Sequence, residues 1–284
     1  MELRAFYNQF LKELRPVYGY EETTAMTTMI FEEFAGKTKT DIITDPGYVI
    51  EPEKLSALEA ALLQLKRQVP VQYIIGHAWF AGLKFKVSPA VLIPRPETEE
   101  LVNEALKFMS ETDVTNALDI GTGSGCIPIT IKKKLPHIHV TAIDISPAAL
   151  EIARTNSQEN GVAIEWIEVD FLEGEGWANL GKYDVIISNP PYIPEREKEL
   201  LDENVTAHEP NIALFVPDNK ALIFYEKIAA FGILHLAKGG MIFMETHESF
   251  ARQVADLFSM QGYRAEVKKD MFEKERMVIA NRFH

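Results

Sequence analysis

The sequence predicts an α/β fold in which a mostly parallel sheet is covered by helices on both faces. From Glu97 onward, short apolar runs typical of strands alternate with amphipathic helical segments, and this alternation is typical of parallel sheets. The tail, "YRAEVKKDMFEKERMVIANRF" (263–283), is instead typical of two strands joined by a charged turn, so we expect an antiparallel hairpin at the C-terminus. Residues 1–69 show only helical periodicity, which predicts a separate N-terminal helical-bundle domain.

Two segments of the N-terminal region carry clear helix signals. "EETTAMTTMIFEEFAG" (21–36) begins with acidic residues, which suit the positive end of the helix dipole, and ends at Gly36, a candidate C-cap. In "EPEKLSALEAALLQLKRQVP" (51–70), leucines at 55, 58, 62 and 65 recur on one helical face and Pro70 ends the pattern. We expect this leucine stripe to form the core of the domain.

The segment between the two domains predicts a β-hairpin. "VQYIIGHAWFAGLKFKVSPAVLIP" (71–94) is rich in aromatic and β-branched residues, with a candidate turn at Gly82. We therefore expect a hairpin linker over 70–96 and the sheet domain over 97–284.

Five apolar runs are the candidate strands that precede the tail. Between two of them, "SPAALEIARTNSQENG" (146–161) has Ser146 at a candidate N-cap and Pro147 at the first helical position. The strands are expected at 116–120, 140–145, 164–170, 183–188 and 240–246.

Composition and charge limit the classes of function. Of the 284 residues, 46% are hydrophobic and 25% are charged, which is typical of a globular protein and argues against disorder. The net charge of -13 disfavours a phosphate backbone as a direct partner. No segment approaches the roughly 20 apolar residues needed to cross a bilayer, and no signal peptide is visible.

The cysteine and histidine content points to a reducing environment without a metal. Cys126 is the single cysteine, so the chain forms no internal disulfide, and we expect a cytoplasmic location. His137 and His139 have no partner cluster in the sequence, and no metal is expected. No residue pattern bears on oligomeric state, and a monomer is our working expectation.

The first motif, "ALDIGTGSGCIPI", is a strand that runs into a glycine-rich turn. Glycines allow positive φ angles and a close approach of a ligand to the backbone. The spacing GxGxG differs from the GxGxxG fingerprint of dinucleotide sites, which points away from NAD. The turn comprises Gly121, Thr122, Gly123, Ser124 and Gly125.

The next two strands also end in residues that could bind a nucleoside. Asp144 can accept hydrogen bonds from both ribose hydroxyls. Asp170 can accept from an exocyclic amine, and Phe171 can pack on an adenine ring. Three such strand ends together favour a nucleoside cofactor; the alternative is that these are ordinary turn and cap residues.

The fourth strand end carries "ISNPPYIP" (187–194). The side-chain oxygen of Asn189 and the carbonyl of Pro190 are two acceptors, and proline holds the backbone stiff. Two acceptors suit a planar NH2 group, and Tyr192 could stack on that group. The simpler alternative is that Asn-Pro-Pro only ends the strand and turns the chain.

At these residues the sequence resembles the AdoMet-dependent methyltransferases that carry an Asn-Pro-Pro-Tyr motif and share a Rossmann-like seven-stranded sheet. Further stretches resemble the PrmC/HemK family of release factor glutamine methyltransferases: "VLIPRPETEELV" (91–102), "NPPYIP" (189–194), "HEPNIAL" (208–214) and "VKKDMFEKERMVIA" in the tail. The resemblance covers the chain from about Pro70 to the end and is weaker over the N-terminal helices.

This resemblance implies transfer of a methyl group from S-adenosyl-L-methionine (AdoMet) to the side-chain amide N5 of the glutamine in the Gly-Gly-Gln motif of peptide chain release factors. It implies that residues 121–125 wrap the methionine end of AdoMet, that Asp144 holds the ribose, and that Asp170 and Phe171 flank the adenine. The expected substrate site consists of Asn189, Pro190, Pro191 and Tyr192. Asn189 and Pro190 are the expected catalytic residues, and Asn189 is also expected to bind the cofactor. The helical domain is expected to dock the protein substrate.

Two rival functions stay open at the level of the sequence. An amine methyltransferase that acts on DNA adenine or RNA guanine uses the same Asn-Pro-Pro-Tyr motif to bind a flipped base. The acidic net charge of this chain argues against that function. A non-catalytic AdoMet-binding protein is the other rival, and the presence of both hydrogen-bond acceptors, at Asn189 and Pro190, argues against that. The roles of Arg95, Glu97 and Glu245 also stay open.

Overall fold

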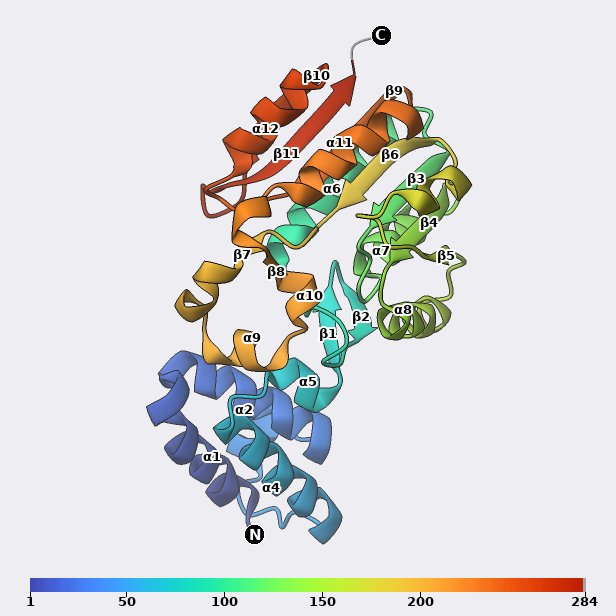
Figure 1. Cartoon of the computed structure of the whole chain (residues 1–284). Helices are drawn as coiled ribbons and strands as arrows, with labels where there is room; N and C mark the ends of the chain where they lie inside the picture. The colour runs from blue at the N-terminus through green and yellow to red at the C-terminus, as the bar shows by residue number, and fades with distance from the viewer. Residues whose placement is uncertain (283–284) are drawn as a thin grey trace. The chain divides into compact units, whose positions relative to one another are not determined.

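The computed structural model describes residues 1–282, apart from the side chain of residue 203. These residues form two compact units (Figure 1). The first unit comprises Met1–His77 together with Asp202–His208, and the second comprises the rest of the described chain. The helical unit thus extends past residue 69 and includes a short segment from the middle of the chain, which no local sequence pattern marks.

The first unit is a helical bundle. The predicted C-cap is confirmed, since Gly36 ends its helix with φ 63°. Leu58, Leu62 and Leu65 are buried, as the stripe predicted, and they join a core in which the rings of Phe10 and Phe31 lie 5.1 Å apart. Its helices are α1 (Leu3–Tyr18), α2 (Tyr20–Ala35), α3 (Lys39–Thr44), α4 (Pro52–Lys66), α5 (Val71–Ile75) and α9 (Glu203–His208).

The hairpin predicted from residue 71 is wrong in its first part. Val71–Ile75 forms helix α5, because Pro70 stands at its N-cap and Gly76 ends it with φ 76°. The hairpin that follows is short, with β1 (His77–Phe80) and β2 (Leu83–Lys86). Ala81 and Gly82 connect the strands with φ of 50° and 78°, which suits a two-residue hairpin turn.

Within residues 1–282, the main sheet of the second unit has seven strands in the order β10-β11-β9-β6-β3-β4-β5. The pairs from β9 to β5 are parallel, and β11 is antiparallel to both β9 and β10, which confirms the predicted fold class and C-terminal hairpin. The strands are β3 (Asn116–Ile120), β4 (His139–Asp144), β5 (Glu165–Glu168), β6 (Tyr183–Ser188), β9 (Leu236–Glu245), β10 (Tyr263–Lys269) and β11 (Glu275–Arg282).

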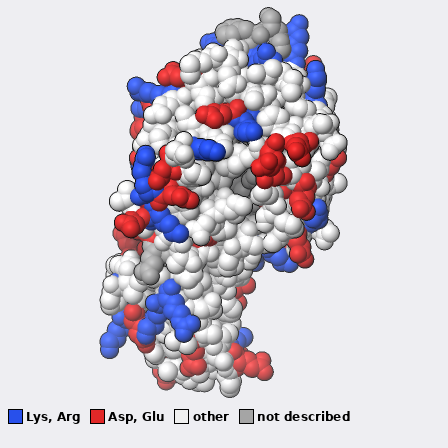
Figure 2. Space-filling view, in the orientation of Figure 1, with Lys and Arg blue, Asp and Glu red and all other residues white. Residues whose placement is uncertain are grey.

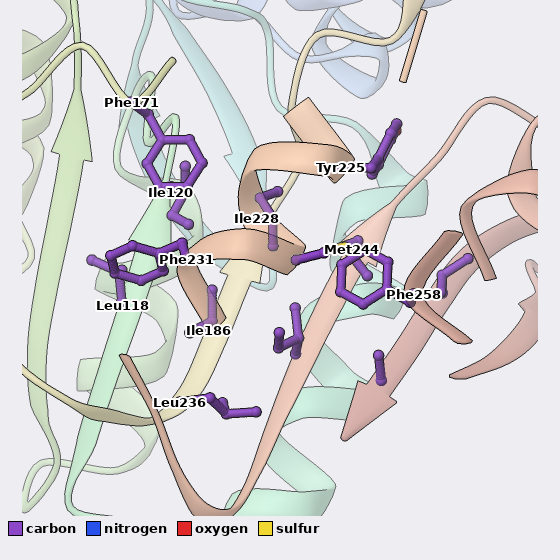
Figure 3. Close-up of a cluster of buried hydrophobic side chains, with 14 of the residues drawn as sticks. Leu118, Ile120, Phe171, Ile186, Tyr225, Ile228, Phe231, Leu236, Met244 and Phe258 are labelled. Atoms are coloured by element: carbon purple, nitrogen blue, oxygen red, sulfur yellow. The ribbon is translucent and has the colours of Figure 1, made fainter. Parts of the chain in front are cut away.

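Helices cover both faces of this sheet (Figure 1). On one face, α11 (Ile223–His235) and α12 (Ala251–Met260) pack over side chains such as Ile186, as Figure 3 shows. On the other face, α6 (Pro96–Glu111) and α7 (Cys126–Lys134) pack over Val185 and Ile187. Adjacent residues of β6 thus point to opposite faces, and both faces are buried, which explains the continuous apolar run of this strand.

Helix α8 (Pro147–Glu159) begins as predicted, with the Ser146 hydroxyl accepting from the backbone N–H of Ala149 at 3.2 Å. Its fully buried Asn156 joins the glycine-rich turn to the hairpin, because its Nδ2 donates to the carbonyls of Ser124 and Lys86. The remaining short elements are η1 (Glu175–Asn179), β7 (Ile193–Pro194), η2 (Glu195–Leu200), α10 (Asn211–Leu214), β8 (Phe215–Val216) and η3 (Asp218–Lys220).

The strand order places a crevice at a predictable position. Strand β4 lies on one side of β3 and β6 on the other, so the direction of chain winding reverses at β3. Ligands of open α/β sheets bind outside the carboxyl ends of the strands at such a switch point. In the described part of the chain, no helix is long and apolar enough to span a membrane.

Candidate active site

A cavity of about 200 Å³ lies at the carboxyl ends of β3, β4 and β6, within the second unit. The structure brings most of the sequence-predicted site residues together around it. Those that line it are Gly121, Thr122, Gly123, Ser124, Asp144, Asp170, Phe171, Asn189, Pro190 and Pro191. Gly125 and Tyr192 are not among its lining residues.

The glycine-rich turn presents bare backbone to the cavity. Gly121 and Gly123 have φ of 75° and 53°, and a Cβ atom added to either would meet no atom within 4 Å. Their positive φ therefore requires glycine, and the open space beside them can receive a ligand. Gly125 differs, because a Cβ there would lie 3.0 Å from the Trp166 ring and 3.1 Å from Ala153. Gly125 serves the packing of α7 instead of the approach of a ligand.

Asp144 stands opposite this turn at the end of β4. Its Oδ2 accepts from the N–H of Gly123 at 2.8 Å, and its Oδ1 accepts from the N–H of Ser146 at 2.9 Å. Burial raises the pKa of this carboxyl, and the backbone donors oppose the shift. Each oxygen keeps a further lone pair, so Asp144 can also accept two hydroxyl hydrogens from a ligand.

Asp170 and Phe171 follow β5 and form another part of the wall. Asp170 Oδ1 accepts from the N–H of Leu172 at 3.0 Å. The Phe171 side chain is 5% exposed and packs against the rings of Trp177 at 5.2 Å and Phe231 at 5.5 Å. Figure 3 shows Phe171 near Phe231. Phe171 is thus held by the core and can offer a ligand only the part of its ring that faces the cavity.

Asn189 follows β6 and is fixed by a residue that the sequence did not single out. Its Nδ2 donates to the hydroxyl of Thr98, in the first turn of α6, at 3.0 Å. The Thr98 hydroxyl donates to Glu245 Oε2 at 2.6 Å, and the Tyr192 hydroxyl donates to Glu245 Oε1 at 3.1 Å. Tyr192 therefore turns its hydroxyl toward the end of β9, beside the cavity.

Asp119 is a second residue that sequence analysis missed. It is 1% exposed in β3, and neither carboxylate oxygen has a hydrogen-bond partner among the described residues. Burial raises its pKa to about 7, while the nearby Thr122 hydroxyl acts in the opposite direction. A carboxylate within an apolar strand, two residues before the first glycine of the turn, was the available signal. Asp119 is not among the residues that line the cavity.

Arg95 and Glu209 join two of the stretches that carried the resemblance. The Glu209 carboxylate is 1% exposed and pairs with the Arg95 guanidinium. Its other oxygen accepts from the N–H of Ile93 at 3.2 Å. Arg95 and Pro210 both line the cavity, so this ion pair fixes one wall of the site. Glu97 stands in the first turn of α6, where its charge raises the pKa of Glu245 after the larger effect of burial.

Solved structures similar to this chain show the kind of fold it has. A methyltransferase from Pyrococcus furiosus matches with a TM-score of 0.50 and 20% identity, over 79% of this chain and 97% of that one. The 16S rRNA N2 G1207 methyltransferase (RsmC) of T. thermophilus, solved with AdoMet and guanosine, also matches with a TM-score of 0.50, at 15% identity over 73% of this chain and 50% of that one. The fold is that of the methyltransferases.

Sequence relatives are more specific. The PrmC N-terminal domain family matches residues 2–76, and the Methyltransferase small domain family matches residues 101–209. The release factor glutamine methyltransferase of Bacteroides thetaiotaomicron is 40% identical over 95% of this chain and 97% of its own. That of Flavobacterium psychrophilum is 37% identical over 99% of both chains. This chain belongs to the release factor glutamine methyltransferase family, which confirms the resemblance seen in its motifs.

Proposed function

We propose that this protein methylates the side-chain amide nitrogen, N5, of the glutamine in the Gly-Gly-Gln motif of peptide chain release factors, with AdoMet as the methyl donor. The observation that carries the proposal is the orientation of Asn189. Its Nδ2 is committed to Thr98, so its Oδ1 is left for a ligand, next to Pro190 and to the open glycine-rich turn. The family of the relatives supports the choice of substrate.

The residues around the cavity fit AdoMet. When bound, AdoMet would supply an electrophilic methyl group on a sulfonium centre. Gly121 and Gly123 leave space against the backbone, Asp144 has acceptors for the ribose, and Asp170 and Phe171 are available to the adenine.

The chain's own groups would orient the amide rather than deprotonate it. Asn189 Oδ1 and the Pro190 carbonyl accept one hydrogen each from the glutamine NH2, which places the nitrogen and draws electron density onto it. AdoMet held at the glycine-rich turn would supply the methyl group that this nitrogen accepts, with the sulfur as the leaving group. The extra proton on nitrogen becomes acidic and leaves afterwards, so positioning supplies much of the acceleration.

Nucleic acid is not part of this proposal. The relatives do not favour the alternative of a nucleic-acid amine methyltransferase. Figure 2 shows basic and acidic side chains interspersed over the face in view, without a continuous basic band of the kind that tracks a phosphate backbone. We further propose that the protein acts as a monomer in the cytoplasm, where translation terminates, and that the helical unit docks the release factor.

One labelling experiment tests the substrate. The protein is incubated with methyl-labelled AdoMet and a release factor, the same factor with Gln→Ala in its Gly-Gly-Gln motif, or DNA and RNA. Label on the intact factor that is absent from the variant supports the proposal. Label on nucleic acid, or equal label on both factors, contradicts it.

A further inference from the structure

A buried chain of hydrogen bonds connects Asn189 to the end of strand β9. It passes from Asn189 Nδ2 to the Thr98 hydroxyl at 3.0 Å, and from that hydroxyl to Glu245 Oε2 at 2.6 Å. The second carboxylate oxygen of Glu245 accepts from the Tyr192 hydroxyl at 3.1 Å. Thr98 is 3% exposed and Glu245 is 1% exposed, so water does not compete for these bonds.

The carboxylate decides which group donates at each step. Thr98 and Tyr192 both donate their hydroxyl hydrogens to Glu245, whose two carboxylate oxygens accept them. A hydroxyl has a single hydrogen to donate, and the Thr98 hydroxyl donates it to Glu245. Thr98 can then only accept from Asn189, and only the NH2 half of that amide can donate. The oxygen half of Asn189 must point the other way.

We propose that Glu245 is a positioning residue: through Thr98, its carboxylate forces Asn189 to present its oxygen, and not its NH2 group, to the substrate. The proposal rests on the proposed function of Asn189 as an acceptor for the glutamine amide. A reversed Asn189 would set its own NH2 against the NH2 of the substrate, where two donors face each other without an acceptor.

The backbone of Glu245 has a separate structural role. Its carbonyl accepts from the Tyr225 hydroxyl at 3.0 Å, and the next residue, Thr246, donates its N–H to the carbonyl of Arg276 at 2.8 Å. Neither bond uses the side chain of Glu245. A change confined to the Glu245 side chain therefore leaves the end of β9 anchored, and its effect on Asn189 can be measured.

Glu245→Gln is the informative variant because it keeps the shape of the side chain and adds a donor. With its NH2 toward Thr98, the glutamine would donate to that hydroxyl, which would then donate to Asn189 and reverse its amide. We expect kcat to fall about tenfold or more, as for the loss of a positioned polar contact in a reacting site. The affinity for AdoMet should stay at the wild-type value in calorimetry.

Thr98 variants test whether the effect passes through this hydroxyl. Thr98→Ser keeps the hydroxyl and should retain kcat, whereas Thr98→Val removes it and should lower kcat. In the Thr98→Val background, Glu245→Gln should cause no further loss, because the connection is already cut. Additive losses would overturn the proposal, and so would a Glu245→Gln enzyme with wild-type kcat. Should Glu245→Gln not fold, the contrast between Thr98→Ser and Thr98→Val decides alone, and equal kcat in these two would overturn it.

A readout without turnover separates this inference from the proposed function. The side-chain NH2 signal of Asn189, assigned by its loss in Asn189→Asp, should exchange slowly in the wild type and change in Glu245→Gln by nuclear magnetic resonance. An unchanged signal would contradict the role of Glu245 whatever the substrate is. A wild-type enzyme that leaves release factors unlabelled would contradict the proposed function, while the signal would still test the direction of the bonds.

Discussion

The two ends of the Asn189 side-chain amide have different roles: the nitrogen contacts the protein, and the oxygen is left for the cavity. Its Nδ2 is held by Thr98, which is 91 residues away in sequence, and Thr98 in turn contacts Glu245, which is 147 residues further on. Asn189 and Asp144 could be predicted because each follows an apolar strand, and parallel strand ends share one edge of a sheet. The contacts of Thr98 and Glu245 could not, because they depend on how distant segments pack.

Two substitutions should separate the chemistry from cofactor binding. Asn189→Ala should retain AdoMet affinity and lose turnover by about a hundredfold or more, because it removes an acceptor that positions the substrate. Asp144→Ala should instead weaken AdoMet binding by about tenfold or more, since hydrogen bonds to a charged group are worth about 1.5–3 kcal/mol.

Single-turnover rates measure the loss of turnover in Asn189→Ala, and calorimetry measures the AdoMet affinity of both variants. Near wild-type turnover in the first variant, or unchanged affinity in the second, would contradict the assignments.

Asp119 should make the stability of the sheet unit depend on pH. Burial raises its pKa from 3.8 to about 7 in the folded protein. Between these values the folded state keeps a proton that the unfolded state has lost. The contribution of Asp119 to the free energy of unfolding is therefore fully present below the lower pKa, and it falls by about 1.4 kcal/mol for each pH unit toward the higher one.

Asp119→Asn should remove this slope. Urea denaturation at pH 5, 6 and 7 should show the variant gaining stability relative to the wild type as the pH rises. Asp113→Asn, at an exposed position, is the matched control and should follow the wild type. Parallel curves for Asp119→Asn and the wild type would show that this carboxyl is not the source of the dependence.

At the scale of elements, the strands of the main sheet were predicted well, and the hairpin was predicted correctly only from His77 onward. Strands β3 and β6 match the expected ranges residue for residue, because a strand buried on both faces gives a continuous apolar run. The run at 71–75 has the same composition but forms helix α5, because Pro70 and Gly76 set its ends. A short apolar run cannot be assigned by periodicity alone.

Gly125 should be required for packing between α7 and its neighbours. Gly125→Ala would place a Cβ 3.0 Å from Trp166 and 3.1 Å from Ala153, at φ 78°. Gly161→Ala is the control, because Gly161 has φ 66° in the same unit but open space around its Cβ position. The control should cost about 1–2 kcal/mol of unfolding free energy for the left-handed backbone alone, and Gly125→Ala should cost clearly more. Equal losses in chemical denaturation would rule out the packing role.

At the scale of the whole molecule, neither unit is a single continuous segment of the sequence. The cavity is lined only by residues of the second unit, as far as the described chain shows. The first unit nevertheless includes α9, where His208 Nε2 lies 3.1 Å from the carbonyl oxygen of Arg67. Local patterns could place the N-terminal helices in one unit, but not α9, because this contact spans 141 residues of sequence.

This division predicts what removal of the helical unit does. A chain that begins at Ala78, with 202–208 replaced by a Gly/Ser linker of the same length, keeps every residue that lines the cavity. Its AdoMet affinity should stay close to that of the full chain. The KM for a release factor should rise about tenfold or more, where each factor of ten corresponds to about 1.4 kcal/mol of lost binding. A short Gly-Gly-Gln peptide, which is too small to reach a docking surface, is the control and should be methylated equally by both chains. An unchanged KM for the intact release factor would show that the helical unit does not dock it.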